Sequence, residues 1–407
     1  MVLEYLTFRQ RVNACLVSKS WAKFIRSIPE LWQHLDLSQG RRRVRTAFIS
    51  RAINAGRTKL TQATLNNVFD FEKSLDALVR NCRIEELRLL DAGVQSDSLR
   101  QSLSRARHLR KLCFDAGTQI GRNTWDAILQ LLANQLESLE YKSVQPSLRV
   151  GMGAVPLSKL QNLRLEVVSL HPAFYSTIGQ MTPELRCLQI RETSPMQRFI
   201  RVPIGRLPRL ESFDLNVLCS IHLDLGTTVP PLSILRLATN SSVSVSFDGA
   251  RSPGLPALRE LALRLPFARG LHPSIDMLAR LKDSSTGNKL LEKMIVRLPL
   301  EDTDVTACEF FSYPRLRALK YLEVGGGDDV AEIVVLHLPL LETVDMSESE
   351  ITGVGVKALA GLPNVRRLVL NNCRLLGRDA VDWARFQGIE IESKPASVET
   401  GGKKVRY

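Results

Sequence analysis

A short pattern, apolar-x-x-apolar-x-apolar, recurs along most of this chain and restricts its fold more than any other feature of the sequence. Consecutive copies lie 22 to 33 residues apart, and all but one of the steps fall between 22 and 28 residues. The middle apolar residues of the copies are Leu87, Leu112, Leu139, Leu163, Leu188, Phe213, Leu235, Leu261, Met294, Leu322, Val344 and Leu368. Two weaker copies, centred on Leu35 and Ala63, extend the series towards the N-terminus. A period of this length predicts an array of small repeated units instead of one compact core.

Each copy predicts one strand and one helix. The Leu-x-Leu alternation has the period of a short strand with one buried face, and residues 97–105 and 124–132, which lie between copies, have the apolar spacing of helices. A single unit cannot bury its apolar face, but stacked units form a continuous core with their strands paired in parallel. The period matches the leucine-rich repeat, and leucine makes up 64 of the 407 residues. We therefore predict an α/β leucine-rich-repeat solenoid over residues 38–392, with about 12 to 14 repeats, a curved parallel sheet and helices on the convex side.

The net charge of +13 is concentrated at the two ends of the chain. Residues 1–60 carry 12 Lys and Arg against 3 Asp and Glu, and residues 393–407 carry 4 against 1, so the 332 residues between them have a net charge of +1. The segment 393–407 is polar and contains glycine, which predicts a disordered basic tail. No apolar run approaches the ~18 residues of a membrane-spanning helix, so we expect no membrane partner.

The first forty residues or so lack the strong form of the repeat and predict two short helices. Thr7 and Gln10 have the spacing of a capping box, and Ser18 can cap a second helix that ends before Pro29. Apolar residues at helical spacing predict a small buried cluster that closes the end of the repeat array. They are Val12, Leu16, Trp21, Ile25, Leu31 and Trp32.

Residues 5–37, YLTFRQRVNACLVSKSWAKFIRSIPELWQHLDL, resemble the F-box. The residues that carry the resemblance are Leu16, Val17, Lys19, Trp21, Pro29, Leu31, Trp32, Leu35 and Leu37. An F-box followed by leucine-rich repeats is the layout of substrate receptors of SCF-type ubiquitin ligases, in which a Skp-type adaptor joins the F-box to a cullin. Residues 351–392 are similar to fungal members of that group, which can also carry tetratricopeptide repeats upstream.

This resemblance implies a receptor subunit that catalyses nothing itself and holds target proteins on the concave face of the repeats for ubiquitin-dependent degradation. It also implies contacts with the adaptor, which we assign to Leu3, Leu6, Leu16, Val17 and Trp21. The family's F-box opens with a Leu-Pro-x-Glu helix, and this chain starts at about the residue where that helix ends. We therefore expect a partial F-box over residues 1–37, either from a truncated gene model, which we favour, or in an isoform that binds its adaptor poorly.

Motifs of common enzymes are missing from the sequence. It contains no Walker phosphate-binding motif, no HExxH zinc motif and no GxSxG nucleophile motif. The seven cysteines are widely spaced, and the six histidines fall at different positions of the repeat. We expect no catalytic residue, no metal site and no cofactor, and we interpret the cysteines as reduced thiols of a nuclear and/or cytoplasmic protein.

Residues between the strand leucines are predicted to line the concave face, where solenoids bind their partners. Over residues 162–297 these positions have an excess of three positive charges. One hypothesis is that they recognise an acidic or phosphorylated protein segment through charge-assisted hydrogen bonds, and the alternative is that they are ordinary solvated positions. The residues that we assign to substrate binding are Arg164, Arg191, Asp214, Arg236, Arg264 and Arg297.

A second basic feature spans residues 40–59. Its apolar residues have the spacing of the buried side of a helix, which leaves a basic patch outside, formed by Arg41, Arg42, Arg43 and Arg45. We rank three interpretations of the patch in descending order: a solvated helix face, a nuclear-localisation cluster, and a phosphate-binding surface for DNA or RNA. Aromatic stacking platforms are missing, so recognition of single strands is unsupported.

Two rival functions follow from these features. The first is a leucine-rich-repeat scaffold for protein interactions that has no connection with ubiquitin and uses the same concave face. The second is a chromatin-associated protein whose basic N-terminal segment binds nucleic acid.

Overall fold

The computed structural model of the protein contains two compact units, Met1–Leu210 and Glu211–Tyr407. The residues that the structure describes are 6–38, 43–56, 59–91, 96–118, 120–144, 149–151, 155–171, 173–194, 199–226, 230–241, 243–246, 255, 257–264, 291–297, 311 and 314–394.

The first unit begins with a helical head. Its segments are α1 (Phe8–Ala14), α2 (Lys19–Ser27) and the 3₁₀ helix η2 (Pro29–Trp32). Both predicted caps are confirmed. The Thr7 hydroxyl accepts a hydrogen bond from the Gln10 backbone N–H while the Gln10 side chain accepts one from the Thr7 backbone, and the Ser18 hydroxyl accepts from a backbone N–H in the first turn of α2.

The buried cluster of the head is smaller than predicted. Four of the six residues are buried: Val12, Ile25, Leu31 and Trp32. Leu16 and Trp21 are exposed, so their assignment to the cluster was wrong. Trp32 lies at the centre of this buried cluster. Its indole N–H donates to the Ile25 carbonyl at 2.9 Å, and its ring packs edge-on against Phe8.

Seven parallel strands among the described residues form the main sheet of the first unit, one from each repeat. In spatial order they are β1 (His34–Asp36), β2 (Gln62–Asn66), β3 (Glu86–Leu90), β4 (Lys111–Phe114), β5 (Ser138–Lys142), β7 (Asn162–Val167) and β9 (Cys187–Glu192). The register places Leu35 opposite Ala63, Ala63 opposite Leu87, and Leu87 opposite Leu112. The predicted repeat, including its two weaker copies, is therefore confirmed in this unit.

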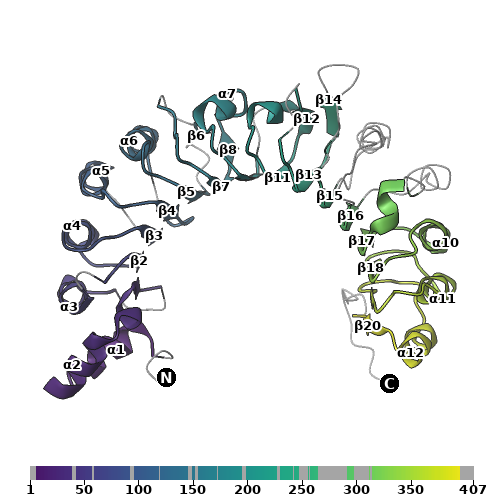
Figure 1. The fold of residues 1–407 in the computed structure, drawn as a ribbon, viewed down its shortest axis with the longest axis horizontal. Coiled ribbons are helices and arrows are strands. Elements are labelled where there is room, and N and C mark those ends of the chain that lie inside the picture. Colours follow the sequence, from purple (N-terminus) through teal and green to yellow (C-terminus); the bar gives the residue numbers. More distant parts are fainter. Residues whose placement is uncertain are drawn as a thin grey trace, which may run out of the picture. The chain divides into compact units, whose positions relative to one another are not determined.

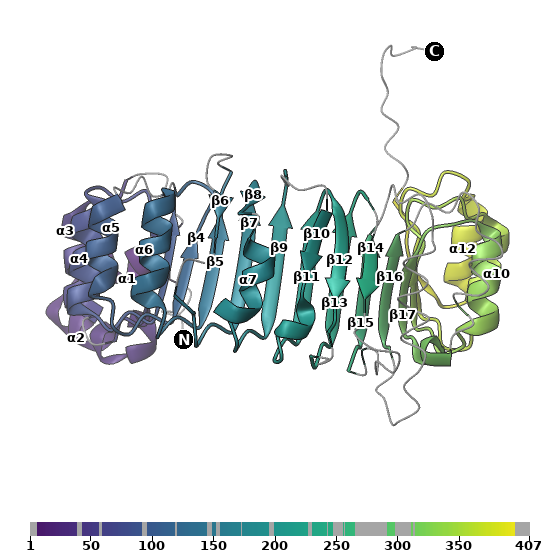
Figure 2. The same ribbon diagram turned by 90° about the horizontal axis from the view of Figure 1, so that it is seen from above.

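Helices lie between most of these strands and cover one side of the sheet (Figure 1), whereas the described residues between β5 and β7 contain a short strand and no helix. They are α3 (Thr46–Gly56), α4 (Phe71–Asn81), α5 (Ser96–Ser104), α6 (Arg122–Leu132) and α7 (Phe174–Met181). The predicted helices at 97–105 and 124–132 are confirmed as α5 and α6. Figure 2 shows α4, α5 and α6 side by side, and the core lies between them and the strands, where Trp125 packs on Tyr141 with 4.6 Å between the ring centroids. Shorter segments complete the unit: β6 (Arg149–Val150), β8 (Ser169–Leu170), β10 (Phe199–Val202) and the 3₁₀ helix η3 (Ile204–Arg206).

The second unit repeats the same plan. Its main sheet among the described residues contains, in spatial order, β11 (Ser212–Val217), β13 (Ile234–Thr239), β15 (Glu260–Arg264), β16 (Lys293–Arg297), β17 (Tyr321–Val324), β18 (Thr343–Asp345), β19 (Arg367–Val369) and β20 (Glu390–Glu392). The helical segments that follow these strands are η4 (Pro314–Ala318), α10 (Asp328–His337), α11 (Gly353–Ala360) and α12 (Arg378–Phe386). Phe213, Leu235 and Leu261 are in register, as predicted, and β20 adds a strand beyond the last predicted copy. Both units are therefore stretches of a leucine-rich-repeat solenoid.

One part of the second unit departs from the expected strand-and-helix unit. Short strands, β12 (Ser220–Asp224) and β14 (Val243–Ser246), stand where helices were expected, and they pair in parallel. The reason lies in the local sequence, because Ile221 and Leu223 are buried and alternate with half-buried polar residues, which is the period of a strand. The apolar side of β12 still faces the core, so the repeat is preserved without a helix.

Some predicted features lie outside the described residues. Most of the insertion expected between Leu261 and Met294 is among them, and so is the tail from residue 395 onwards. Among the described helices, none is both long enough and apolar enough to cross a membrane.

A buried carboxylate lies in the first unit. The Glu192 side chain accepts hydrogen bonds from the Leu170 backbone N–H at 2.8 Å and from the Tyr175 hydroxyl at 3.0 Å. Burial raises the pKa of Glu192, and this effect outweighs the two hydrogen bonds, which lower the pKa. The folded state therefore favours the protonated carboxyl more than the unfolded state does.

We expect the free energy of unfolding of the Glu192→Gln variant, relative to that of the wild type, to increase as the pH rises. The wild-type protein loses stability as the pH passes from the ordinary pKa of the side chain through the raised one, because the unfolded state then ionises more readily, and the neutral amide does not titrate. Urea denaturation between about pH 4 and pH 8 measures the difference in the free energy of unfolding. A difference that stays constant over this range would contradict the assignment.

Candidate protein-interaction surfaces

The helical head exposes a cluster of apolar side chains between residues 16 and 24. The exposed fractions are 65% for Leu16, 73% for Val17, 49% for Trp21 and 54% for Phe24. We call these four residues the head patch. Leu16 and Val17 lie in the turn after α1, and the other two lie on α2. Exposed apolar groups gathered in so short a segment are typical of an interaction surface.

Of the residues predicted to contact an adaptor, the structure places Leu16, Val17 and Trp21 in the head patch. Leu6 is half-buried just before α1, and Leu3 lies outside the described residues. Phe24 was not predicted as a contact residue. Its spacing of three from Trp21, which puts both side chains on neighbouring positions of one helix, was the available signal.

Arg11 links two separate segments of the head by hydrogen bonds. Its Nε donates to the Leu6 carbonyl at 2.8 Å, and its Nη1 donates to the Leu31 carbonyl at 2.6 Å. Burial lowers the pKa of this guanidinium. Leu6 precedes α1 and Leu31 follows α2 in the chain. The two hydrogen bonds of Arg11 therefore fix α1 relative to the segments before it and after α2.

The side of each main sheet opposite the helices carries the charged residues that the sequence assigned to substrate binding, and we call it the open face. In the first unit Arg164 lies 3.5 Å from Glu140, and Arg191 lies 3.6 Å from Glu166. Lys142 lies 3.8 Å from both carboxylates. Positive and negative side chains therefore alternate from strand to strand.

The second unit shows the same alternation. Arg236 donates to Glu260 at 2.9 Å and lies 3.8 Å from Asp214, while Arg264 lies 3.9 Å from Glu323. The hydrogen bond to Glu260 raises the pKa of Arg236. Burial raises the pKa of Glu260, but the hydrogen bond and charge of Arg236 together with nearby Lys293 outweigh it, and the net shift is downward. The side chain of the predicted residue Arg297 lies outside the described part of the structure.

These pairs change the charge balance that the sequence indicated. Glu140 and Glu323 lie just outside residues 162–297, and each neutralises an arginine that was counted in the positive excess. The open face is therefore a surface of mixed charge in both units. Its arginines still expose much of their side chains, so they can form additional hydrogen bonds with a partner.

The basic patch is described only in part. Arg41 and Arg42 lie outside the described residues. Arg43 and Arg45 are exposed, as predicted, but they precede α3 instead of lying on it, because Val44 between them forms a parallel bridge with Val68. Ile49, Ala52 and Ile53 form the buried side of α3, whereas Phe48 is half-buried and Val44 lies before the helix, so the predicted apolar helix face is confirmed only over residues 48–53.

Clustered metal ligands and reactive thiols are the groups that would point to a chemical activity. The described residues contain no group of three or more His, Cys, Asp or Glu side chains placed to hold a metal ion. Cys113 lies on the open face, but burial, and then the neighbouring charge of Glu140, raise the pKa of its thiol to about 12. A thiol with so high a pKa is a poor nucleophile at neutral pH.

Comparison with known proteins assigns the head to a family. Residues 1–38 match the family described as F-box-like. The chain therefore carries an F-box-like segment at its N-terminus, followed by leucine-rich repeats. The F-box/TPR repeat protein pof3 of Schizosaccharomyces pombe (strain 972 / ATCC 24843) is 32% identical over 120 residues, which cover 27% of this chain and 21% of the relative. The chain thus spans about a fifth of the length of that relative.

The chain also has a weak similarity to two solved structures over most of its length. The crystal structure of the Rad7 and Elc1 complex in yeast has a TM-score of 0.42 and 14% identity, covering 83% of this chain and 81% of the other. The crystal structure of the LRIM1/APL1C complex has a TM-score of 0.35 and 15% identity, covering 91% and 65%.

The contribution of the two Arg11 hydrogen bonds to the stability of the F-box-like head can be tested by substitution. We expect Arg11→Met to destabilise the head by about 1–3 kcal/mol, because two carbonyls lose a charged donor. Hydrogen exchange of amides in α1 and α2 measures the local loss, and Arg9→Met, which removes an exposed arginine on the same helix, is the matched control. Equal exchange in the two variants would contradict the role of Arg11.

Proposed function

We propose that this F-box protein is the substrate-recognition subunit of an SCF-type ubiquitin ligase. The F-box-like head would bind a Skp-type adaptor and, through it, a cullin-RING ligase, while the open face of the repeats would hold target proteins for ubiquitin-dependent degradation. The observation that carries the proposal is the exposed head patch, which lies within the residues that match the F-box-like family.

Such a receptor needs no catalytic residue of its own. It binds a target and the ligase at the same time, so the lysines of the target meet the ubiquitin-loaded enzyme at a raised effective concentration. The head patch and the open face suit these two contacts. An apolar patch in the turn after α1 and on α2 can form a buried contact with the adaptor, and a long charged sheet face can bind folded or extended proteins.

Target recognition is assigned to the open face, with Arg164, Arg191, Asp214, Arg236 and Arg264 as contact residues, together with Arg297. Because the described arginines already face carboxylates, a partner of mixed charge fits better than a purely acidic one. An acidic or phosphorylated segment would instead compete with these carboxylates for the guanidinium groups. We place the protein in the nucleus and/or cytoplasm, where the ligase acts on its targets.

The head patch can be tested by adaptor binding. We expect the double substitution Val17→Asp/Trp21→Asp to weaken binding of a purified Skp-type adaptor by at least about 30-fold, because an exposed aromatic anchor is lost and two charges are buried at the contact. Isothermal titration calorimetry with the full chain measures the dissociation constant.

The matched control is Phe386→Asp, which removes an apolar side chain that is 88% exposed at the end of α12 in the second unit. This variant should bind the adaptor as the wild type does. Absence of adaptor binding by the wild-type chain, or equal binding by the head-patch variant, would overturn the proposal and favour a scaffold without a ligase.

The open face can be tested in cells through protein turnover. We expect the triple substitution Arg191→Ala/Arg236→Ala/Arg264→Ala to lengthen the half-lives of the proteins that accumulate when this F-box protein is deleted, while adaptor binding is retained. Quantitative mass spectrometry after a translation block measures the half-lives. Unchanged turnover with an intact fold would remove the assignment of these arginines to target binding.

A further inference from the structure

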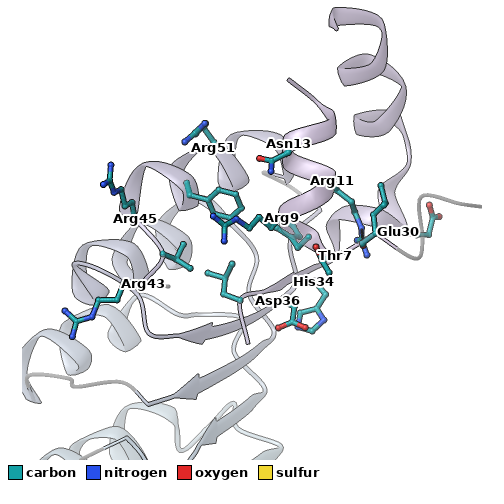
Figure 3. A pocket seen from close by; sticks show the side chains of 15 residues that line it. Thr7, Arg9, Arg11, Asn13, Glu30, His34, Asp36, Arg43, Arg45 and Arg51 are labelled. Atoms are coloured by element: carbon teal, nitrogen blue, oxygen red, sulfur yellow. Dashed lines mark hydrogen bonds between the residues drawn. The ribbon is translucent and has the colours of Figure 1, made fainter. Parts of the chain in front are cut away.

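A basic pocket lies where the F-box-like head meets the first repeat. It has a volume of about 880 Å³ and is bounded by α1, by β1 and by the start of α3. Two carboxylates line it, those of Glu30 and Asp36, and five arginines: Arg9, Arg11, Arg43, Arg45 and Arg51. The lining therefore has an excess of three positive charges. Figure 3 shows that these arginines come from two sides, Arg9 and Arg11 from α1 and the other three from the segment around α3.

The arginines of this pocket differ from those of the open face in one respect. Within the described part of the chain, none of the five has a carboxylate within 4.0 Å, whereas Arg164, Arg191, Arg236 and Arg264 all have one. Arg11 is satisfied by the two carbonyls of the head, and Arg51 donates to the Ala47 carbonyl at 3.3 Å. Asp36 already accepts a hydrogen bond from the Ser38 backbone at 2.8 Å. The positive charge is thus not neutralised by the pocket itself.

Apolar side chains line the same pocket. Leu37 is buried, and Leu6, Val44 and Phe48 are half-buried between the arginines. A bare anion would contact only the guanidinium groups and leave these side chains unused. A peptide segment that places one apolar side chain against Phe48 and carboxylates on either side would satisfy both kinds of lining.

We propose that this pocket binds an acidic peptide segment of a partner protein, anchored by one apolar side chain. Carboxylates of the segment accept hydrogen bonds from Arg9 on one side and from Arg45 and Arg51 on the other. None of the head-patch residues lines the pocket, so the site is distinct from the patch assigned to the adaptor, and the inference does not depend on the ligase function. Nucleic acid fits less well, because of the two phenylalanines in the described lining Phe8 is buried and Phe48 is half-buried, so the pocket offers no row of stacking platforms.

The test uses a fluorescein-labelled synthetic peptide with several Asp and Glu residues around one Leu, and fluorescence anisotropy with the full chain at physiological salt. The variant is Arg45→Glu/Arg51→Glu, which changes two exposed residues, one directly before α3 and one in its middle. The control is Arg107→Glu/Arg122→Glu, which makes the same change in net charge at two exposed arginines that do not line the pocket. Far-UV circular dichroism and thermal melting confirm that both variants are folded.

We expect the wild type and the control to bind the peptide alike, and the pocket variant to bind at least about 10-fold more weakly. Replacing the Leu of the peptide by Asn should weaken binding as well, because the apolar lining then lacks a partner. Equal losses in the pocket variant and the control would show that only net charge matters and would overturn the proposal. Undetectable binding to the wild type, or tighter binding of a single-stranded oligonucleotide that is lost in the same pocket variant, would also overturn it.

Discussion

Burial of one aligned row of apolar side chains is the interaction on which the rest of the structure depends. In each unit the middle residue of every strand lies directly opposite its equivalents in the neighbouring strands, as Leu87 does with Leu112 and Leu235 does with Leu261. No single repeat could bury its leucines alone, so the parallel pairing of strands and the apolar core form together. This constraint leaves the positions between the leucines free to vary, and these positions make up the open face.

The head patch and the open face both follow from the geometry of a repeat array, which exposes its core at the end and leaves one sheet face without helices. The first repeat needs a cover for its core, and the head supplies it with Trp32 while its outer residues remain exposed as the head patch. The open face cannot be apolar in water, and here it is covered by ion pairs between strands. Both surfaces present exposed side chains, an apolar set on the head and a charged set on the open face.

The repeat and its register could be predicted from the sequence because every strand had to place the same apolar residues in one core. The same reasoning failed for Leu16 and Trp21, since helical spacing shows which residues share a face but not whether a neighbour covers that face. It also failed for residues 220–224, where the repeat allows a strand or a helix on the outer side and the alternation of Ile221 and Leu223 decides. The positive excess over residues 162–297 does not describe the charge that a partner meets, because Arg164 and Arg264 lie beside Glu140 and Glu323, which are outside that window and are neighbours only across the sheet.

The sequence by itself determined the repeat, the caps of the head helices and the resemblance of the head to the F-box, because each of these depends on residues close together in the chain or on a strict period. Only the tertiary structure decided which charges meet and which remain free. Arg164 is paired with a carboxylate 24 residues away, whereas Arg9 and Arg45, which the sequence did not connect, line one pocket without such a partner. The physical reason is that pairing across a sheet and between packed helices depends on distances in space, which a linear pattern does not contain.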